Sequence, residues 1–526
     1  MNKVITGWVA AMLLVSSTAD AQVCDETDGV QQSLQYLRRL SFDLRGRAPT
    51  IDELNEVIAT GQVTDAQIDD MLASDDFLQQ TRRYHLDLLW SNISNLPLTN
   101  NTFRLVRDRR GIYYLPASQR RINYRGQNVQ CLDEPARFDD DGNILTTPDA
   151  NDPSVRREGW VEIQPYWDPS SVVRVCAFDA QAAAQAPGRN GTPVDCTRSS
   201  AAVGCGCGPQ LRYCQSTADR TNQQITQAFA EQLLGYVDSI VQNDRPYSDL
   251  ILGKDMPING PIAFYLRYQT GGGGTNLLVS PDQNHPLPDL SFTADDNWQT
   301  VQRGERHAGV LTMPAFLLKF ASNRGRANRF YQAFLCQEFL SSEIVPPTTD
   351  DCHQEPDLTK RCGCQGCHQA VEPAAAYWGR WAETGLLPLN EDQFPRYQAA
   401  CATPQAGRNP LCRLFYFTAA DVTAEVENEF VGQLRAFVFA DSQREANIDT
   451  GPEGLAQAAV DTGAFARCST ERAWKLLLNR DPNTDEADQF ANIVSAFETE
   501  GRSYRALVRA IVTSDSYARA GRYGEN

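Results

Sequence analysis

Histidine and methionine are scarce in this sequence, with five of each among 526 residues. Basic residues are also in deficit, because 48 Lys and Arg stand against 66 Asp and Glu and leave a net charge of −18. This deficit argues against nucleic acid as the main partner, since phosphate binding requires an excess of Lys and Arg. G-x-S-x-G, H-E-x-x-H and P-loop sequences are also missing, so the common hydrolase, metalloprotease and nucleotide-binding motifs give no lead.

Long apolar runs are lacking except at the N-terminus. Lys3 precedes an apolar stretch over 4–15, and Ala19-Asp20-Ala21 has the small-x-small form of a signal-peptidase site. The stretch is too short to span a bilayer, and no second 18-residue apolar run follows it. We therefore expect a signal peptide at 1–21, no transmembrane segment in the mature chain, and export to the periplasm or the outer cell surface, where the protein could associate with the envelope.

Cysteine, by contrast, is abundant, with 15 residues. Export would place them in an oxidising compartment, where disulfides persist. Cys401 and Cys412 bracket a short loop and predict one local bridge. Two further bridges are expected among Cys196, Cys205, Cys207 and Cys214, and Cys336 is expected to pair with Cys352 or Cys362.

The most specific motif is C-x-x-C-H, formed by Cys364, Cys367 and His368. Two thiols at this spacing can add to the two vinyl groups of one porphyrin, and the following His then ligates the iron. Chance would give about 0.004 such matches in a chain of this composition. We therefore predict one covalent haem c, with thioether bonds to Cys364 and Cys367 and His368 as the proximal iron ligand.

Two points remain open at the motif. Cys362 could replace Cys364 in the first thioether bond, although the normal spacing favours Cys364 and leaves Cys362 for a disulfide. A zinc site or a disulfide knot is the alternative to haem. Thirteen cysteines remain beyond the two haem cysteines, so one is expected to be free or to pair with another chain.

The distal iron ligand must come from upstream, because neither Met nor His follows His368. Met313 is the first candidate and His307 the second, since both lie in one short segment before a helix. An iron with water or an open site is the third possibility. Beyond the expected signal peptide, the remaining upstream residues of these two types are Met71, Met256, His85, His285 and His353. We expect His85 to be a buried histidine bonded to Asp87 or to a backbone carbonyl.

Helical periodicity dominates the rest of the chain. Thr50 with Glu53, and Thr64 with Gln67, predict two capping boxes at helix starts. Segments 160–165 and 171–176 are β-prone. A helix-Pro turn-helix-helix pattern near 47–77 resembles another near 480–517, which suggests two copies of one packing unit or two convergent helical hairpins.

The expected fold is therefore mainly α, built of packed multi-helix modules with a cytochrome c-like haem segment and an irregular, partly β insertion held by disulfides. The expected order is a signal peptide at 1–21, an N-terminal helical module at 22–100, the insertion at 101–217, a helical module with a Gly-rich loop at 218–345, the haem segment at 346–421, and a C-terminal helical module at 422–526.

Several short segments occur in an order that is typical of one known family. They are 36–50, 243–247, 258–263, 308–317, the haem motif with 371–373 and 379–381, and 465–517. In this order they resemble the exported cytochrome c-like proteins of planctomycetes and myxobacteria, which are built of domains of unknown function. The resemblance covers most of the chain outside 100–220. It implies an exported, helical, covalent-haem protein and supplies no substrate.

Three functions follow from these features. The favoured one is an exported c-type cytochrome that transfers electrons to or from a redox partner protein. The second is a peroxidase-like haem oxidoreductase with an open distal site. The third is a non-catalytic envelope or surface-binding protein in which any haem is structural.

Overall fold

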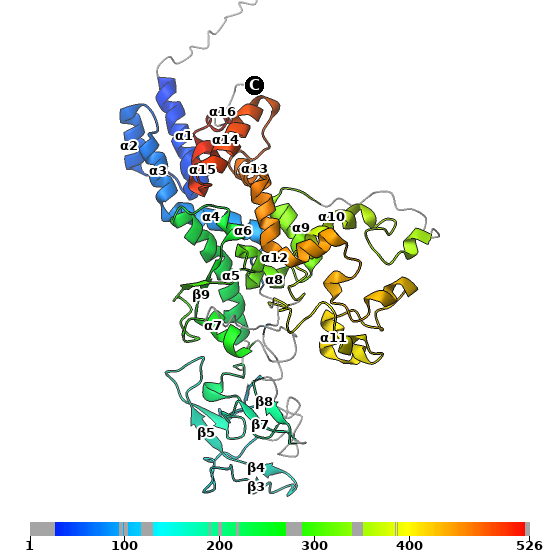
Figure 1. Ribbon diagram of the computed structural model, residues 1–526. Coiled ribbons are helices and arrows are strands. Elements are labelled where there is room, and N and C mark those ends of the chain that lie inside the picture. Colours follow the sequence, from blue (N-terminus) through cyan, green and yellow to red (C-terminus); the bar gives the residue numbers. More distant parts are fainter. Residues whose placement is uncertain are drawn as a thin grey trace, which may run out of the picture.

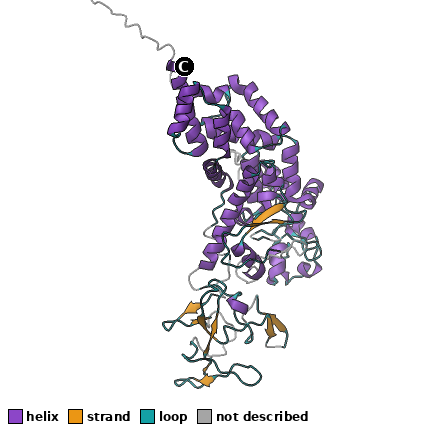
Figure 2. Cartoon of the chain, turned by 90° about the vertical axis from the view of Figure 1, so that its left-hand side faces the viewer, coloured by secondary structure: helices purple, strands orange, loops and turns teal. Residues whose placement is uncertain are grey.

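The protein is mainly helical, with a few small sheets. The computed structural model describes residues 27–93, 98, 104–116, 130–188, 191–197, 202–216, 220–269, 287–338, 351–383, 385–386 and 388–520. The expected signal peptide and most of the expected Gly-rich loop lie outside these residues. Figure 2 shows the strands gathered at one end of the molecule, apart from the β9–β10 pair, which lies among the helices.

The N-terminal helices begin and end at strong capping signals. They are α1 (Thr27–Arg45), α2 (Ile51–Thr60), α3 (Asp65–Ala73) and α4 (Asp75–Leu89). Both predicted capping boxes are confirmed, at Thr50 with Glu53 and at Thr64 with Gln67. Each box satisfies backbone N–H groups that the first helical turn leaves without partners. The Arg45 guanidinium and the Thr50 N–H lower the pKa of Glu53 to about 2.

The C-terminal helices repeat these local devices. They are α13 (Ala464–Leu478), the short η11 (Thr484–Glu486), α14 (Ala487–Thr499), α15 (Tyr504–Val512) and α16 (Asp515–Ala520). Glu486 closes a capping box with Asn483 and pairs with Arg480, and its pKa falls to about 2. Both halves therefore carry an Arg, a Pro turn and a Glu-capped helix in the same order.

The two ends of the chain lie side by side and share one hydrophobic core (Figure 1). Tyr36 Oη donates to the Val512 carbonyl at 2.7 Å, and Arg39 donates to the Tyr517 carbonyl at 2.8 Å. Tyr517 Oη in turn donates to Asp43 at 2.6 Å. These polar contacts align α1 with the end of α15 and with α16.

The insertion is a set of short strands held by disulfides. Its four-stranded sheet has the order β1-β2-β6-β5, and two strand pairs, β3–β4 and β7–β8, lie beside it. The strands are β1 (Val106–Arg107), β2 (Tyr113–Tyr114), β3 (Thr147–Pro148), β4 (Arg156–Arg157), β5 (Trp160–Ile163), β6 (Val173–Cys176), β7 (Gln185–Pro187) and β8 (Pro193–Asp195). Both predicted β-prone runs are confirmed, because β5 and β6 pair antiparallel with Trp160 opposite Cys176.

One tyrosine anchors this insertion to the helices. Tyr166 is buried, stacks on Phe264 with 4.2 Å between ring centroids, and bonds to Thr221 Oγ1 at 2.8 Å. Phe264 and Thr221 belong to helices of the next part of the chain. The insertion therefore joins the main core through an aromatic contact as well as through the chain itself.

The middle of the chain forms the centre of the core around the long helix α5 (Arg220–Gln242). Around it lie α6 (Asp249–Leu252), β9 (Asp255–Ile258), α7 (Gly260–Phe264), the π-turn η4 (Tyr265–Gln269), β10 (Gln299–Gln302), the 3₁₀ turn η5 (Gly309–Thr312), α8 (Pro314–Lys319) and α9 (Asn323–Phe334). Arg326 of α9 is fully buried and donates to the carbonyls of Leu317, Phe320 and Ala382. A cation therefore fixes the turn between α8 and α9.

Six disulfides join described cysteines: Cys131–Cys176, Cys196–Cys205, Cys207–Cys214, Cys336–Cys468, Cys352–Cys362 and Cys401–Cys412. The local predictions for Cys401–Cys412 and for two bridges within 196–214 are confirmed. The pairing of Cys336 is wrong, because α13 packs beside α9 and brings Cys468 to it. Cys24, the cysteine that belongs neither to these six disulfides nor to the C-x-x-C-H motif, lies outside the described residues, so the predicted odd cysteine stays a prediction.

These disulfides are compatible with an exported protein. None of the described helices combines the length and the hydrophobicity that a bilayer crossing requires.

Candidate haem segment and cavity

The C-x-x-C-H motif lies at the start of helix α10 (Gln365–Ala376). Cys364 is the residue before the helix, and the Cys367 and His368 amides both donate to its carbonyl, at 3.2 and 3.0 Å. The two thiols are therefore one helical turn apart, on the same side of the helix start. Both side chains are partly exposed, and neither belongs to the six disulfides.

The neighbouring disulfide resolves the role of Cys362. It joins Cys362 to Cys352 in the short turn η6 (Asp351–Gln354) that precedes the motif. Gly363 follows with φ +76°, a conformation that favours glycine and turns the chain into α10. The expectation that Cys362 is used in a disulfide is confirmed, which leaves Cys364 as the first cysteine of the motif.

His368 is oriented by a carboxylate one turn further along α10. Its Nδ1 lies 2.6 Å from Glu372 Oε1, and Arg324 Nε of α9 donates to the same oxygen at 2.6 Å. A carboxylate acceptor at Nδ1 leaves Nε2 as the ring nitrogen available to a metal. Glu372 is largely buried, with 11% of its side chain exposed, so the Arg324–Glu372–His368 contact is partly shielded from water.

A cavity of about 440 Å³ lies beside α10, and its lining includes Glu372 but not Cys364, Cys367 or His368. Glu372, Ala375, Ala376 and Gly379 line one side of it, and Arg324 of α9 lies at its edge. A Cβ at Gly379 would lie 2.7 Å from Ile448 Cγ1, so glycine allows α12 to pack closely here. The volume is within the usual range for small-molecule and cofactor pockets, roughly 300–1,000 Å³.

The other walls come from later segments of the chain. They include α11 (Pro410–Phe415), the 3₁₀ turns η9 (Glu425–Phe430) and η10 (Arg435–Phe437), and α12 (Ser442–Asp461), which Gly451 kinks with φ +70°. Two more 3₁₀ turns, η7 (Ala399–Ala402) and η8 (Ala406–Arg408), support α11. A third, η3 (Pro209–Leu211), belongs to the insertion. Figure 1 shows α10 beside α12, and Asn447 of α12 donates to the Pro373 carbonyl at 2.9 Å.

The two distal-ligand candidates lie elsewhere. Met313 is fully buried in the main core as the residue before α8. Trp378 Nε1 donates to the Leu311 carbonyl at 3.3 Å, so this segment lies at the C-terminal end of α10. His368 is about 12 Å back along the helix from Ala376. The cavity lining in the described chain includes neither Met nor His. Met313 or His307 as the distal ligand stays a prediction.

His307 is a buried, neutral histidine in this structure. Its Nδ1 lies 2.7 Å from Thr312 Oγ1, and burial together with Arg303 lowers its pKa to about 3. The prediction for His85 is confirmed for the carbonyl alternative, because its Nδ1 donates to the Thr81 carbonyl at 2.8 Å. His353 is at the Cys352 turn, and Met71 and Met256 are core residues. His285 lies outside the described residues.

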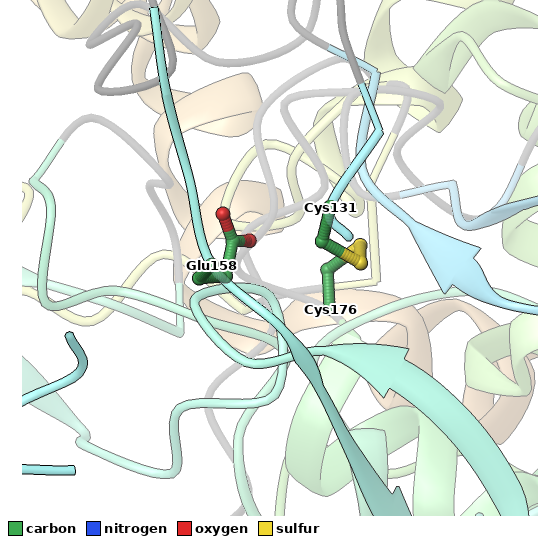
Figure 3. Close-up of side chains that lie close together, drawn as sticks. All are labelled: Cys131, Glu158 and Cys176. Carbon is green, nitrogen blue, oxygen red and sulfur yellow. A yellow bond between two sulfur atoms is a disulfide. The ribbon is translucent and has the colours of Figure 1, made fainter. Parts of the chain in front are cut away.

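A second cluster of possible metal ligands lies in the insertion, formed by Cys131, Glu158 and Cys176. Figure 3 shows the Glu158 carboxylate beside the bond that joins the two sulfurs. Zinc binds cysteine as thiolate, and a sulfur in a disulfide supplies none. The group is therefore a disulfide with a buried carboxylate beside it.

Sequence reasoning found the motif but missed Glu372, Arg324 and the cavity. Glu372 could have been found, because it follows His368 by four positions, which places the two side chains on one face of a helix. Arg324 and the residues of the opposite wall approach through tertiary packing, for which a single sequence carries no signal.

Comparison with known proteins adds no relative. Neither the scan of protein-family models nor the searches of curated proteins and of solved structures found a match. Function is therefore inferred from the residues and their geometry.

Proposed function

We propose that this chain is an exported c-type cytochrome-like protein that binds one covalent haem and transfers electrons to or from a redox partner protein. The observation that carries the proposal is the contact of His368 Nδ1 with Glu372, in a C-x-x-C-H motif at a helix start beside a cavity. When bound, haem supplies a one-electron iron couple.

The residues present fit this group in three ways. Cys364 and Cys367 offer thiols one turn apart for the two vinyl groups. The Cys352–Cys362 bridge withdraws the competing cysteine. Ala375 and Ala376 offer small apolar side chains to the cavity next to Glu372, against which a planar macrocycle could pack.

Glu372 has a positioning role in this proposal. By accepting the Nδ1–H, its carboxylate fixes the tautomer and the ring orientation of His368 and makes Nε2 a stronger donor to a metal. Arg324 shares the same carboxylate oxygen and moderates its negative charge. Loss of the Glu372 charge should therefore weaken the donation from His368 and favour the reduced state of an iron bound to it.

A specific observation favours the second candidate, a haem-dependent oxidoreductase with an open distal site. Met313 is enclosed in the core, and His307 is buried with its Nδ1 bonded to Thr312. A strongly donating proximal His with no protein ligand opposite it would leave a position for a small oxidant such as peroxide.

The deciding experiment is a pyridine haemochrome spectrum, with a haem stain after a reducing, denaturing gel, on protein exported from a host that carries cytochrome c maturation machinery. We expect a c-type spectrum and a stain that survives denaturation. The C364S/C367S variant should lose both, and the matched control C352S/C362S should keep both. A colourless wild-type protein, or loss of haem only in the control, would refute the proposal.

Ferric and ferrous spectra then separate the two candidates. A six-coordinate wild-type spectrum that changes in M313L or H307Q identifies a distal protein ligand and supports electron transfer. A high-spin spectrum that neither variant changes, with cyanide binding to the ferric protein, supports the open-site oxidoreductase. The E372Q variant should keep its haem and show a more positive reduction potential than wild type.

A further inference from the structure

The cavity wall contains a buried cation that has no acidic partner among the described residues. Arg444 lies in the first turn of α12 and is only 8% exposed. Its Nη1 donates to the Phe439 carbonyl at 2.7 Å and its Nη2 to the Val438 carbonyl at 3.3 Å. Its Nε is buried, and no group in the described chain accepts from it.

The other two arginines of the lining are paired. Arg435 lies 3.0 Å from Asp421, and Arg324 lies 2.6 Å from Glu372. The two buried acids of the lining are also engaged, because Glu427 accepts from the backbone of Thr423 and Ala424 and Asp357 accepts from Thr359. Arg444 is therefore the arginine of this wall whose charge the described protein leaves uncompensated.

An uncompensated buried guanidinium is costly. Main-chain carbonyls satisfy individual N–H groups but do not cancel the charge, and the two bonds above use two of the five N–H groups of an arginine. A planar guanidinium with N–H groups to spare is well suited to bind a carboxylate. The local backbone holds it in place, since Phe439, whose carbonyl Arg444 binds, adopts a φ of +55° that is strained for a bulky residue.

Part of the surface around Arg444 is apolar. Leu414, Phe415, Leu434, Val438 and Phe439 share the lining with it, and the carboxylates of Asp357, Glu372, Glu383 and Glu427 supply polar parts of the same lining. A ligand that satisfies both features carries a negative charge at one end of an apolar body, because the body fills the apolar walls and the charge meets the guanidinium.

We propose that Arg444 is the anion-binding residue of this cavity and that it takes a carboxylate borne on an apolar molecule. Two sources share that chemistry. One is a propionate of a haem attached at Cys364 and Cys367, and this source rests on the proposed function. The other is a free apolar carboxylic acid, which the cavity could bind whether or not haem is attached.

The test compares R444M with R435M, a matched control that removes a paired arginine from the same lining. Two readouts are needed: the haem reduction potential of protein that passes the haemochrome test, and calorimetric binding of octanoate, with octanamide as its neutral analogue, to protein with and without haem. The R444K variant keeps the positive charge but lacks the planar guanidinium, and it replaces R444M in the test if the methionine variant does not fold.

A propionate source predicts a more negative potential in R444M, a smaller shift of the same sign in R444K, no shift in R435M and no octanoate binding. A free-acid source predicts that wild type binds octanoate and not octanamide, and that R444M binds octanoate at least tenfold more weakly while R435M does not. Equal potentials in R444M and R435M, with no octanoate binding to wild type, would overturn the proposal. If the wild-type protein contains no haem, the proposed function is refuted. Octanoate binding then decides alone whether Arg444 binds a carboxylate.

Discussion

His85 should make the protein lose stability in mildly acidic solution. The imidazole is fully buried on α4, and its Nε2 accepts from Tyr247 Oη at 2.7 Å. Tyr84 and Tyr504 pack against the ring, with centroids 4.9 and 5.5 Å away. Burial lowers the pKa of His85 from 6.5 to about 4, so the native state keeps this histidine neutral where an unfolded chain would protonate it.

Proton linkage gives the sign and the size of the change in unfolding free energy with pH. Below pH 6.5 the unfolded chain binds a proton that the folded chain does not bind until the pH reaches about 4, so stability falls as the pH falls through this window. A difference of this size corresponds to about 3 kcal/mol once pH 4 is reached, and to about 2 kcal/mol between pH 7.5 and pH 5. From about pH 7.5 upward the histidine is almost entirely neutral in both states and contributes no pH dependence.

The measurement is the free energy of unfolding in urea at pH 7.5 and at pH 5, for wild type and for H85Q. Glutamine can accept from Tyr247 but does not titrate. The variant should be less stable at pH 7.5 because of imperfect packing, yet its loss of stability between the two pH values should be about 2 kcal/mol smaller than that of wild type. An equal loss in the two proteins would refute a neutral, buried His85.

Two further predictions concern stability. Removing the Cys336–Cys468 bridge, which spans 132 residues, should lower the free energy of unfolding by about 5 kcal/mol through loop entropy. Removing the Cys196–Cys205 bridge, which spans nine residues, should lower it by about 3 kcal/mol. Urea unfolding of the two double-serine variants checks this ranking, and the reverse order would contradict it. Thr50→Ala should cost about 1 kcal/mol, because α2 loses its N-cap and the Glu53 N–H loses an acceptor; an unchanged thermal midpoint would show that this cap contributes nothing.

Features that depend on neighbours in sequence could be predicted. The capping boxes at Thr50 and Thr64 depend only on residues three positions apart. The strands at 160–163 and 173–176 are predicted by their β-prone residue composition. The Cys401–Cys412 bridge closes a loop so short that the partner is evident. In each case the determining interaction lies within one turn, strand or loop.

Features that depend on tertiary packing could not be predicted from the sequence. Cys336 pairs with Cys468 because α9 and α13 lie side by side, whereas the sequence suggested the nearer cysteines as partners. Nothing in the sequence around Arg444 distinguishes it from an exposed arginine, and it is buried only in the folded chain, where the Val438 and Phe439 carbonyls accept from it. The haem motif was visible because its chemistry is confined to five consecutive residues, while the cavity beside it is built from segments more than a hundred residues apart.

The contact between the N-terminal and C-terminal helices also determines when part of the native packing can form. Tyr36 and Val512, joined by a hydrogen bond, are 476 residues apart, so α1 is synthesised long before its partner exists. Until then α1 and α3 can pack on α2 and α4, but the parts of their surfaces that contact α15 and α16 stay uncovered. Contacts of such sequence separation slow folding, because the loop must close before they form. The contacts of α1 and α3 with α15 and α16 are therefore expected to be among the last tertiary contacts to form.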